Sequence, residues 1–475
     1  MKMFKFLPLV AAVMLTGCVS MSPFYDRPES PVNAAWPEGS AYDQAKLNQA
    51  ALPDWEAFYT DDRLRQVIRL TLENNRDYRV AMLNVERLRQ AYNIQRSEFL
   101  PYLAATGQGS HSRTSDLLRK PDQAAVSHSY TANLAMAAYE LDLFGRIKSL
   151  SDQALNRYFA TEEARKSARA TLIAETANLW LKLGADRSIL AFAKTTLESQ
   201  EKSFKLSEAS YQAGAISLLE LNQARTMLAN AQKSYAASER AVAQDLNAMG
   251  VLVGCEVPEA LLPSKVEVVT LGAVLPQGAP SEVLLNRPDI AAAEYTLLAA
   301  NANIGAARAA FFPRITLVGS YGSGAGELDD LFTGGTRMWS FVPSVSLPIF
   351  TAGASWAAYQ VSQRDKDIAI ANYEKAIQVA FKEVADALAT EGTIEAELKA
   401  QEALAASTKQ AYDLAQARYK QGASSFLEVL DSQRQWVGAQ TGLVVAQQAR
   451  AASLVTLYKT LGGGAVDTQK DEAEK

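Results

Sequence analysis

The residue with the clearest chemical assignment is Cys18, which ends the tetrapeptide Leu15-Thr16-Gly17-Cys18. Two lysines and an apolar stretch too short to span a bilayer precede it, as in a bacterial lipobox. This pattern predicts that residues 1–17 are a lipoprotein signal peptide and that Cys18 is lipidated after cleavage. Val19 stands where an Asp would retain a lipoprotein at the inner membrane, which favours the outer membrane. The alternative is an ordinary signal peptide followed by a chance cysteine.

A second set of candidates consists of acidic side chains that follow a Tyr-x-x-Gly motif, which occurs twice and ends at Gly214 and Gly422. Glu428 and Asp431 lie about one helical turn apart on the same face of a predicted helix. Around a shared axis, each like-charged pair about 8 Å apart would cost roughly 2 kcal/mol at an effective dielectric of about 20, before screening. Such a ring attracts cations and needs compensating contacts to close. The alternative is a solvated helix face.

The composition is that of a globular chain of 475 residues, with 48% hydrophobic and 21% charged residues. Beyond the N-terminal segment, no apolar run reaches the roughly 18 residues that a membrane-spanning helix needs. The net charge of −5 argues against nucleic acid as a partner. With Cys18 lipidated, Cys255 is the remaining cysteine and no intrachain disulfide can form.

The first half of the sequence recurs in the second at a nearly constant offset of about 210 residues, which indicates an internal duplication. Each half has the same predicted order: a helix, two strands and very long helices. In the first half, the opening helix is predicted over 65–100 and stops at Pro101. The matched landmarks are Asp77 with Asp289, Leu141–Phe144 with Leu347–Phe350, Glu175 with Glu383, and Tyr211 with Tyr419.

Four segments have the period-two alternation of half-buried strands, and each is long enough for a tilted transmembrane strand. Four strands cannot close a barrel, and an open edge in lipid leaves backbone groups unpaired, so copies of the chain must pool their strands. Two, three and four copies all satisfy this requirement. Trp339 and Phe341 would suit an aromatic girdle, and the alternative for them is an ordinary sandwich core. The strands are predicted at 102–113, 127–143, 315–321 and 338–349.

The rest of the mass is predicted to be helix with coiled-coil spacing. Stripes running from Leu221 to Met249 and from Val429 to Leu457 advance mostly by alternating threes and fours. Helices of about 50 residues would be roughly 75 Å long. Many stripe residues are Ala, Ser or Thr, which let helices pack on two sides, as in the wall of a tunnel. The alternative is a long bundle or stalk without a lumen.

Five motifs support a family resemblance: Tyr25–Pro28, Tyr139–Arg146, Arg287–Ile290, Ile304–Pro313 and Leu461–Gly464. They resemble the TolC-like outer-membrane efflux lipoproteins that serve resistance-nodulation-division (RND) transporters in Gram-negative bacteria. The resemblance implies a mixed α+β membrane protein, a homotrimer with a 12-stranded β-barrel (four strands per chain) that continues into a long α-helical coiled-coil tunnel. It also implies a passive multidrug exit duct that sits in outer membrane lipid, extends into the periplasm, and is opened by a periplasmic membrane-fusion adaptor and an inner-membrane RND transporter.

The resemblance also places functional positions. The turns at Gly214 and Gly422 would form the periplasmic tip and contact the adaptor. Ser424 stands where the family archetype has an Arg in its closing contacts, so Arg434 or Arg225 is expected to supply the cation. Glu428 and Glu220 stand where the archetype has Asp. The expected periplasmic gate consists of Tyr419, Glu428, Asp431, Arg434 and Glu220.

The predicted organisation begins with the signal peptide and ends in a charged, disordered tail. In order, the segments are the signal peptide 1–17, a lipid anchor and N-terminal equatorial segment 18–64, the first repeat 65–250, an equatorial linker 251–281, the second repeat 282–460 and the tail 461–475.

An enzyme is not expected. The chain has two histidines, His111 and His128, both in predicted strands, and no triad, metal or phosphate-loop spacing accompanies them. We therefore expect no catalytic residue, no metal site and no cofactor beyond the lipid on Cys18. The alternatives are an outer membrane channel for heavy-metal efflux or protein secretion, and a coiled-coil envelope lipoprotein that forms no channel.

Overall fold

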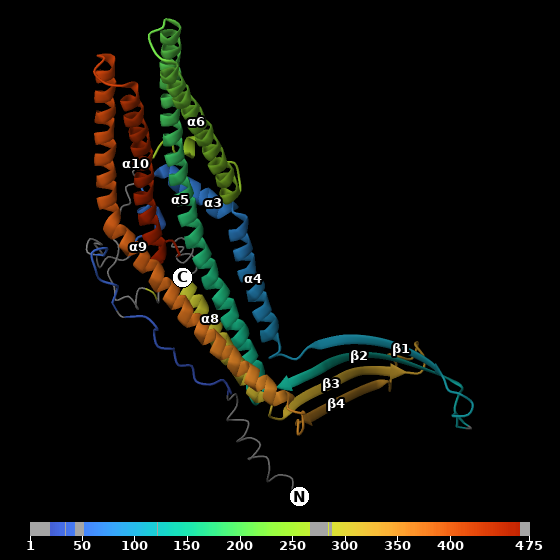
Figure 1. Ribbon diagram of the computed structural model, residues 1–475. Helices are drawn as coiled ribbons and strands as arrows, with labels where there is room; N and C mark the ends of the chain where they lie inside the picture. Colours follow the sequence, from blue (N-terminus) through green and yellow to red (C-terminus); the bar gives the residue numbers. More distant parts are fainter. Residues whose placement is uncertain are drawn as a thin grey trace. The chain divides into compact units, whose positions relative to one another are not determined.

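The computed structural model describes residues 20–33, 35–42, 52–120, 122–266, 284 and 287–465 (Figure 1). Cys18, residues 267–281 of the predicted linker and residues 466–475 of the predicted tail lie outside the described residues. Among the described residues, no helix is both long and apolar enough to cross a membrane. The elements are α2 (Trp55–Phe58), α3 (Asp62–Asn74), α4 (Arg76–Ser97), β1 (Leu103–Arg113), β2 (Val126–Leu141), α5 (Arg146–Gln212), α6 (Leu218–Val253), η2 (Glu259–Leu261), α8 (Pro288–Ala309), β3 (Arg314–Ala325), β4 (Arg337–Ser346), α9 (Ala354–Lys420) and α10 (Phe426–Thr460).

The internal duplication is visible in the lengths of the elements. Helices α4 and α8 each have 22 residues, and α5 and α9 each have 67. The helices that follow are α6, with 36 residues, and α10, with 35. The two halves differ mainly in their strands, since β2 has 16 residues and β4 has 10. The predicted order of helix, strands and long helices is therefore confirmed in both halves.

The chain forms two compact units, and each contains segments from both halves. We call them the sheet unit and the hairpin unit. The sheet unit contains the residues up to Glu29, Asn84–Thr161 and Ala292–Tyr373, and the hairpin unit contains Ser30–Leu83, Glu162–Ala291 and the residues from Glu374 onward.

In the sheet unit, four antiparallel strands lie in the order β1-β2-β3-β4. The central pairing joins the two halves of the sequence, because β2 pairs with β3. Strands β1 and β4 are the two edges of the sheet, and all residues of β4 are exposed. The predicted positions of the four strands are confirmed, although β2 ends at Leu141 and β4 at Ser346, a few residues before the predicted ends.

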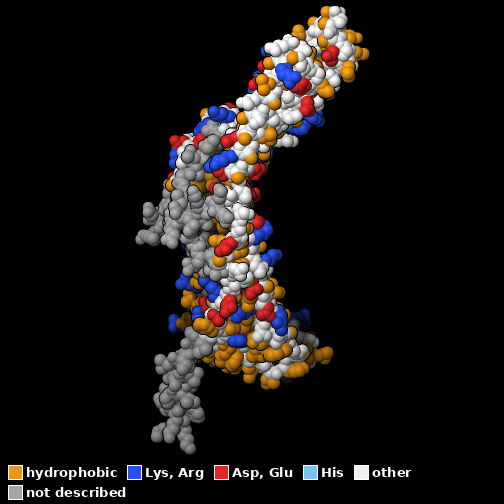
Figure 2. Space-filling view, turned by 60° about the vertical axis from the view of Figure 1, so that its left-hand side comes forward, with side chains coloured by type: hydrophobic (Ala, Val, Ile, Leu, Met, Phe, Trp, Pro, Cys, Tyr) orange, Lys and Arg blue, Asp and Glu red, His pale blue; other side chains and the backbone are white. Residues whose placement is uncertain are grey.

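The two faces of this sheet differ in chemistry. One face carries cross-strand hydroxyl pairs, with oxygen-to-oxygen distances of 2.8 Å for Ser320–Ser340 and 2.6 Å for Thr316–Ser344. The other face is apolar, and its Trp339 side chain is 76% exposed. Figure 2 shows hydrophobic side chains gathered over the sheet, at the bottom of the view. A sandwich core is therefore the wrong interpretation of Trp339 and Phe341, because no second layer within the described residues covers them.

The hairpin unit contains two helical hairpins, α5 with α6 and α9 with α10 (Figure 1). The predicted coiled-coil stripes are confirmed in part as a packed seam, since Leu221, Ala224, Ala231 and Met249 are buried. A compact core lies near the end of α10, where the rings of Phe58 and Tyr458 stack with centroids 3.9 Å apart.

The structure differs from the expected boundaries at three places. The helix predicted over 65–100 is two helices, because Asn75 has an extended backbone and its side-chain oxygen accepts a hydrogen bond from the Tyr78 amide at 2.7 Å, which starts α4. Helix α6 ends at Val253, three residues inside the predicted linker. Residues 461–465 are packed rather than part of a tail, since Leu461 is buried and Arg169 donates to the Gly464 carbonyl at 2.8 Å.

Candidate functional site

The two turns that close the helical hairpins have the same backbone geometry. At Gly422, φ is +72°, its amide donates to the Tyr419 carbonyl, and the Ala423 amide donates to Arg418, with both distances 2.9 Å. Gly214 has the same φ and the equivalent bonds. This is a Schellman motif, and it requires a left-handed residue that glycine supplies without strain. The Tyr-x-x-Gly pattern is thus the C-terminal cap of α5 and of α9.

A serine then starts each second helix, three residues after the glycine. Ser217 accepts a hydrogen bond from the Glu220 amide at 3.2 Å, and the Glu220 carboxylate accepts one from the Ser217 amide at 2.8 Å. This reciprocal arrangement is a capping box, which places Glu220 in the start of α6. Ser425 accepts from the Glu428 amide at 3.3 Å at the start of α10.

The carboxylate of Glu428 has a different partner from that of Glu220. Arg418, in the last turn of α9, donates to Glu428 with a nitrogen-to-oxygen distance of 3.4 Å and to the Ala423 carbonyl at 3.3 Å. The two arginines expected in the closing contacts have other partners within the single chain. Arg434 instead pairs with Asp431, and the Arg225 guanidinium lies 5.9 Å from the centre of the Phe204 ring.

Asp431 accepts two side-chain hydrogen bonds within α10. Arg434 donates at 2.6 Å and Gln435 at 2.7 Å. The bond from Arg434, followed by that from Gln435, holds the pKa of the Asp431 carboxyl below its ordinary value. The charge of this carboxylate is therefore favoured in the single chain, although both Asp431 and Arg434 remain well exposed.

Tyr419 interacts with residues at the start of both second helices, Phe426 in α10 and Glu220 in α6. Its ring centre is 5.3 Å from that of Phe426 in the next helix. Burial raises the pKa of its hydroxyl, and the charge of Glu220 raises it further. The charge of Glu220 thus acts on the Tyr419 hydroxyl, and Glu428 and Asp431 lie on the first two turns of α10.

Apolar side chains surround these turns. Leu218, Leu219 and Leu427 are each more than half exposed. Further along the hairpins, Phe192, Met227 and Val437 help to line a groove of about 560 Å³ formed by α5, α6 and α10. Exposed leucines and a partly apolar groove are features that a partner protein can cover.

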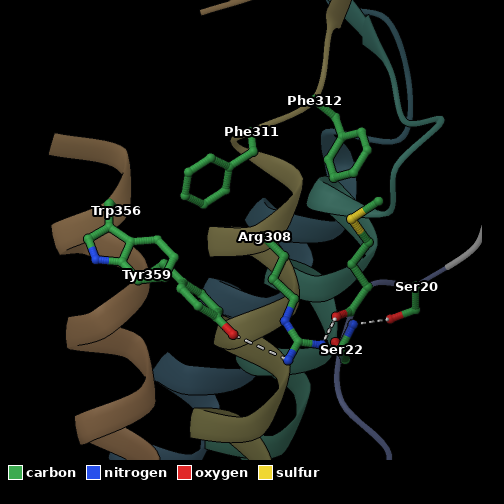
Figure 3. A pocket seen from close by; sticks show the side chains of 8 residues that line it. Ser20, Ser22, Arg308, Phe311, Phe312, Trp356 and Tyr359 are labelled. Atoms are coloured by element: carbon green, nitrogen blue, oxygen red, sulfur yellow. Dashed lines mark hydrogen bonds between the residues drawn. The ribbon is translucent and has the colours of Figure 1, made fainter. Parts of the chain in front are cut away.

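The described chain begins at an open, apolar pocket of the sheet unit, which Figure 3 shows. Its volume is about 570 Å³, and Phe311, Phe312 and Trp356 line it together with the start of the chain at Ser20. Arg308 fixes this segment, because its guanidinium donates to the Met21 carbonyl at 3.3 Å and to the Tyr359 hydroxyl at 3.4 Å. Cys18 lies outside the described residues, two positions before Ser20.

Comparisons with known proteins decide the family. A model of the family described as outer membrane efflux protein matches residues 67–254 and 279–463. The chain belongs to this family. It is 44% identical over 465 residues to the solvent efflux pump outer membrane protein SrpC of Pseudomonas putida, covering 97% of this chain and 98% of that protein. It is 40% identical to the outer membrane protein OprJ of Pseudomonas aeruginosa, covering 96% and 95%.

Solved structures give the same answer for the fold. The open state of the MtrE outer membrane channel from Neisseria gonorrhoeae has a TM-score of 0.83 and 36% identity, covering 94% of this chain and 99% of that chain. A membrane protein from Pseudomonas aeruginosa has a TM-score of 0.86 and 39% identity, covering 93% and 100%. The resemblance drawn from the motifs is therefore confirmed, and the family is one of efflux channels rather than of enzymes.

Two features were missed from the sequence. The Ser-x-x-Glu pattern at Ser217 and Ser425 is a readable capping signal and could have been found. The role of Arg418 could not, because it depends on the geometry of the turn that brings α9 beside the start of α10. Within the part of the chain that the structure describes, no group of three or more His, Cys, Asp or Glu side chains could hold a metal ion.

Proposed function

We propose that three copies of this chain form the outer membrane exit duct of a tripartite efflux pump. The observation that carries this proposal is the one-sided sheet, which has an exposed apolar face, a hydroxyl-lined face and two edge strands in a single chain. In lipid, each edge would leave backbone groups unpaired, so β1 of one subunit must pair with β4 of the next. Three copies give twelve strands, with the apolar face toward lipid and the hydroxyl face toward the lumen.

The duct itself is passive in this proposal. Hydroxyl pairs such as Ser320–Ser340 offer no charge or deep pocket that would select a solute. Selection and energy then come from an inner-membrane RND transporter, and a periplasmic adaptor docks on the exposed leucines at the turns and in the neighbouring groove. The relatives named for solvent, toluene and antibiotic efflux favour multidrug export over heavy-metal efflux or protein secretion.

Lipidation of Cys18 would add an anchor to the barrel. The motif at Leu15–Cys18 supports lipidation. Ser20, two residues after this cysteine, lines the apolar pocket of the sheet unit. Intact-mass spectrometry of the membrane-extracted protein tests this point by itself. The mass of the wild-type protein should exceed that of the mature polypeptide by a diacylglycerol and one further acyl chain, and Cys18→Ala should abolish the increment.

The resting duct is closed, in this proposal, by contacts at the turns of the two hairpins. Tyr419 and the carboxylates of Asp431 and Glu428 would converge around the trimer axis, and docking of the partners would separate them. Because the ion pairs of Asp431 and Glu428 are exposed, water and salt screen them strongly, so partner binding can break them.

Single-channel recording of the purified trimer in a planar bilayer tests both the duct and its gate. Wild-type protein should show rare, small openings, and the variant that combines Asp431→Ala with Tyr419→Phe should conduct more. Asp386→Ala is the matched control, because Asp386 is also an exposed carboxylate in an ion pair, with Lys382 on α9. A lack of any conductance in all three proteins would refute the duct, whereas an unchanged closed state in the double variant would refute only the latch.

A further inference from the structure

The two histidines of the chain lie directly opposite each other in the sheet unit. His111 in β1 and His128 in β2 are partners in the antiparallel register. Their Nδ1 atoms are 2.6 Å apart, and their ring centres are 4.8 Å apart with the planes at 72°. Both side chains are exposed in the single chain, and they lie on the face of the sheet that carries Trp339, close to the end of β1 that leads into the connection to β2. A chain of 475 residues that contains two histidines thus places them in direct contact.

The surrounding hairpin holds this pair in place. On the opposite face, the hydroxyls of Ser112 and Ser127 are 2.8 Å apart, which fixes the neighbouring register position. Tyr130 lies opposite Gly109, where an added Cβ would be only 3.3 Å from its ring, so the glycine gives the ring room against β1. The Tyr130 hydroxyl is 3.5 Å from Nε2 of His111.

We propose that His111 and His128 form a two-imidazole binding site for a divalent transition metal ion, with Cu²⁺ bound more tightly than Ni²⁺ or Zn²⁺. Neutral imidazole nitrogen is a preferred ligand of these ions, and affinity for nitrogen ligands follows the order that places Cu²⁺ highest. The proposal does not depend on the proposed function, and it departs from our expectation that the chain has no metal site.

The geometry needs little change to accept the ion. Two nitrogens bound side by side to one ion, each about 2.1 Å from it, are about 3 Å apart. The present separation of 2.6 Å means that one Nδ1 donates a hydrogen to the other, so a small ring rotation opens the required space. The hydrogen on that Nδ1 moves to the Nε2 of the same ring as the metal takes its place, and no net proton is released from two neutral rings.

The second nitrogen of His111 already has a neighbour. With the metal on Nδ1, Nε2–H of His111 points at the Tyr130 hydroxyl oxygen, an arrangement that orients metal-binding histidines in general. Water would complete the coordination, because two side chains supply only two ligands. Arg113 is two positions further along the same face, and its positive charge argues for moderate rather than high affinity.

Metal titration of the purified trimer, prepared with a tag that lacks histidine and in a Cys255→Ser background, tests the proposal. Calorimetry should give one Cu²⁺ ion per chain, and electron paramagnetic resonance of the bound Cu²⁺ should show splitting from two nitrogens. His111→Gln and His128→Gln should each weaken binding at least tenfold and leave splitting from one nitrogen at most. The double variant, which contains no histidine, should lose both signals, and Tyr130→Phe should weaken binding about tenfold.

Circular dichroism and trimer mass control for folding of the variants. The proposal is wrong if the Cys255→Ser protein binds no Cu²⁺ saturably, or if two-nitrogen splitting persists in the folded double variant.

Discussion

Arg287 gives the sharpest test of how the end of the second repeat is held together. Its side chain is only 8% exposed. It donates to the Thr460 carbonyl at 2.9 Å, to Asp289 at 3.0 and 2.7 Å, and to Glu383 at 2.7 Å. Thr460 is the last residue of α10, so its carbonyl has no partner within the helix and relies on this guanidinium.

The expected loss of local stability in Arg287→Ala is the sum of the costs for each hydrogen-bond partner of the guanidinium. The Thr460 carbonyl belongs to a residue that is 4% exposed, and leaving it unpaired costs about 2 kcal/mol. Asp289 and Glu383 are more than one third exposed, so water replaces much of each lost bond and we assign about 0.5 kcal/mol to each. The local opening free energy should therefore fall by about 3 kcal/mol, which corresponds to roughly 100-fold faster amide exchange.

Hydrogen exchange measured by mass spectrometry can locate this effect. Peptides that cover residues 455–465 and 287–296 should exchange faster in Arg287→Ala, whereas peptides from α6 should not change. Arg364→Ala is the control, because Arg364 also pairs with an aspartate at 2.7 Å but is 72% exposed, and we expect less than about 0.5 kcal/mol there. Equal exchange rates in the two variants would refute the assigned role of the buried guanidinium. The exchange rate in Arg287→Lys should lie between those of the two variants, because lysine keeps the charge but lacks the planar guanidinium with its several donors.

Two further predictions concern close packing and a buried carboxylate. Gly305→Ala would place a Cβ 2.6 Å from the Ser22 backbone nitrogen, so the segment at residues 20–22 should detach from α8 at a cost of about 1–3 kcal/mol, which limited proteolysis of the N-terminal segment would detect. Burial raises the pKa of Asp245, whose carboxylate shares the Lys182 ammonium with Asp186. A raised folded-state pKa contributes stability that is present below the ordinary aspartate pKa and is lost as the pH rises through the folded value. The stability of Asp245→Asn relative to wild type should therefore increase as the pH rises above the ordinary aspartate pKa of about 4 in chemical denaturation, and a constant difference would contradict this assignment.

The sequence predicted the repeated order of elements because that order rests on periodicity, which is local information. The positions of the four strands and the presence of very long helices follow from hydrophobic spacing and from Pro101 and Pro313, although α5 and α9 have 67 residues each, more than the expected length of about 50. The break at Asn75 was missed because helical spacing continues across it. Its asparagine is nevertheless a cap signal, and its amide group also donates to the Leu252 carbonyl, a contact that only the tertiary structure supplies.

The sequence located the two hairpin turns but not the side-chain pairs around them. The residues near Gly214 and Gly422 were found because the motif is written twice, yet Arg418 as partner of Glu428 depends on how the turn folds back. The contact between His111 and His128 likewise depends on strand register, because a shift of one residue would place the two rings on opposite faces. Pairings across a turn or between strands are three-dimensional facts that spacing alone does not fix.

The two hairpins have diverged at one chemically important point. In the first, Glu220 closes a capping box, an arrangement that contributes about 1 kcal/mol to the start of its helix and leaves that carboxylate committed. In the second, Ser425 caps without the reciprocal bond, and Glu428 pairs across the turn with Arg418 in an exposed ion pair that contributes less. A charged group of a docking protein can replace Arg418 or Glu428 in this exposed ion pair with little loss of free energy. A docking protein should therefore move α10 more readily than α6.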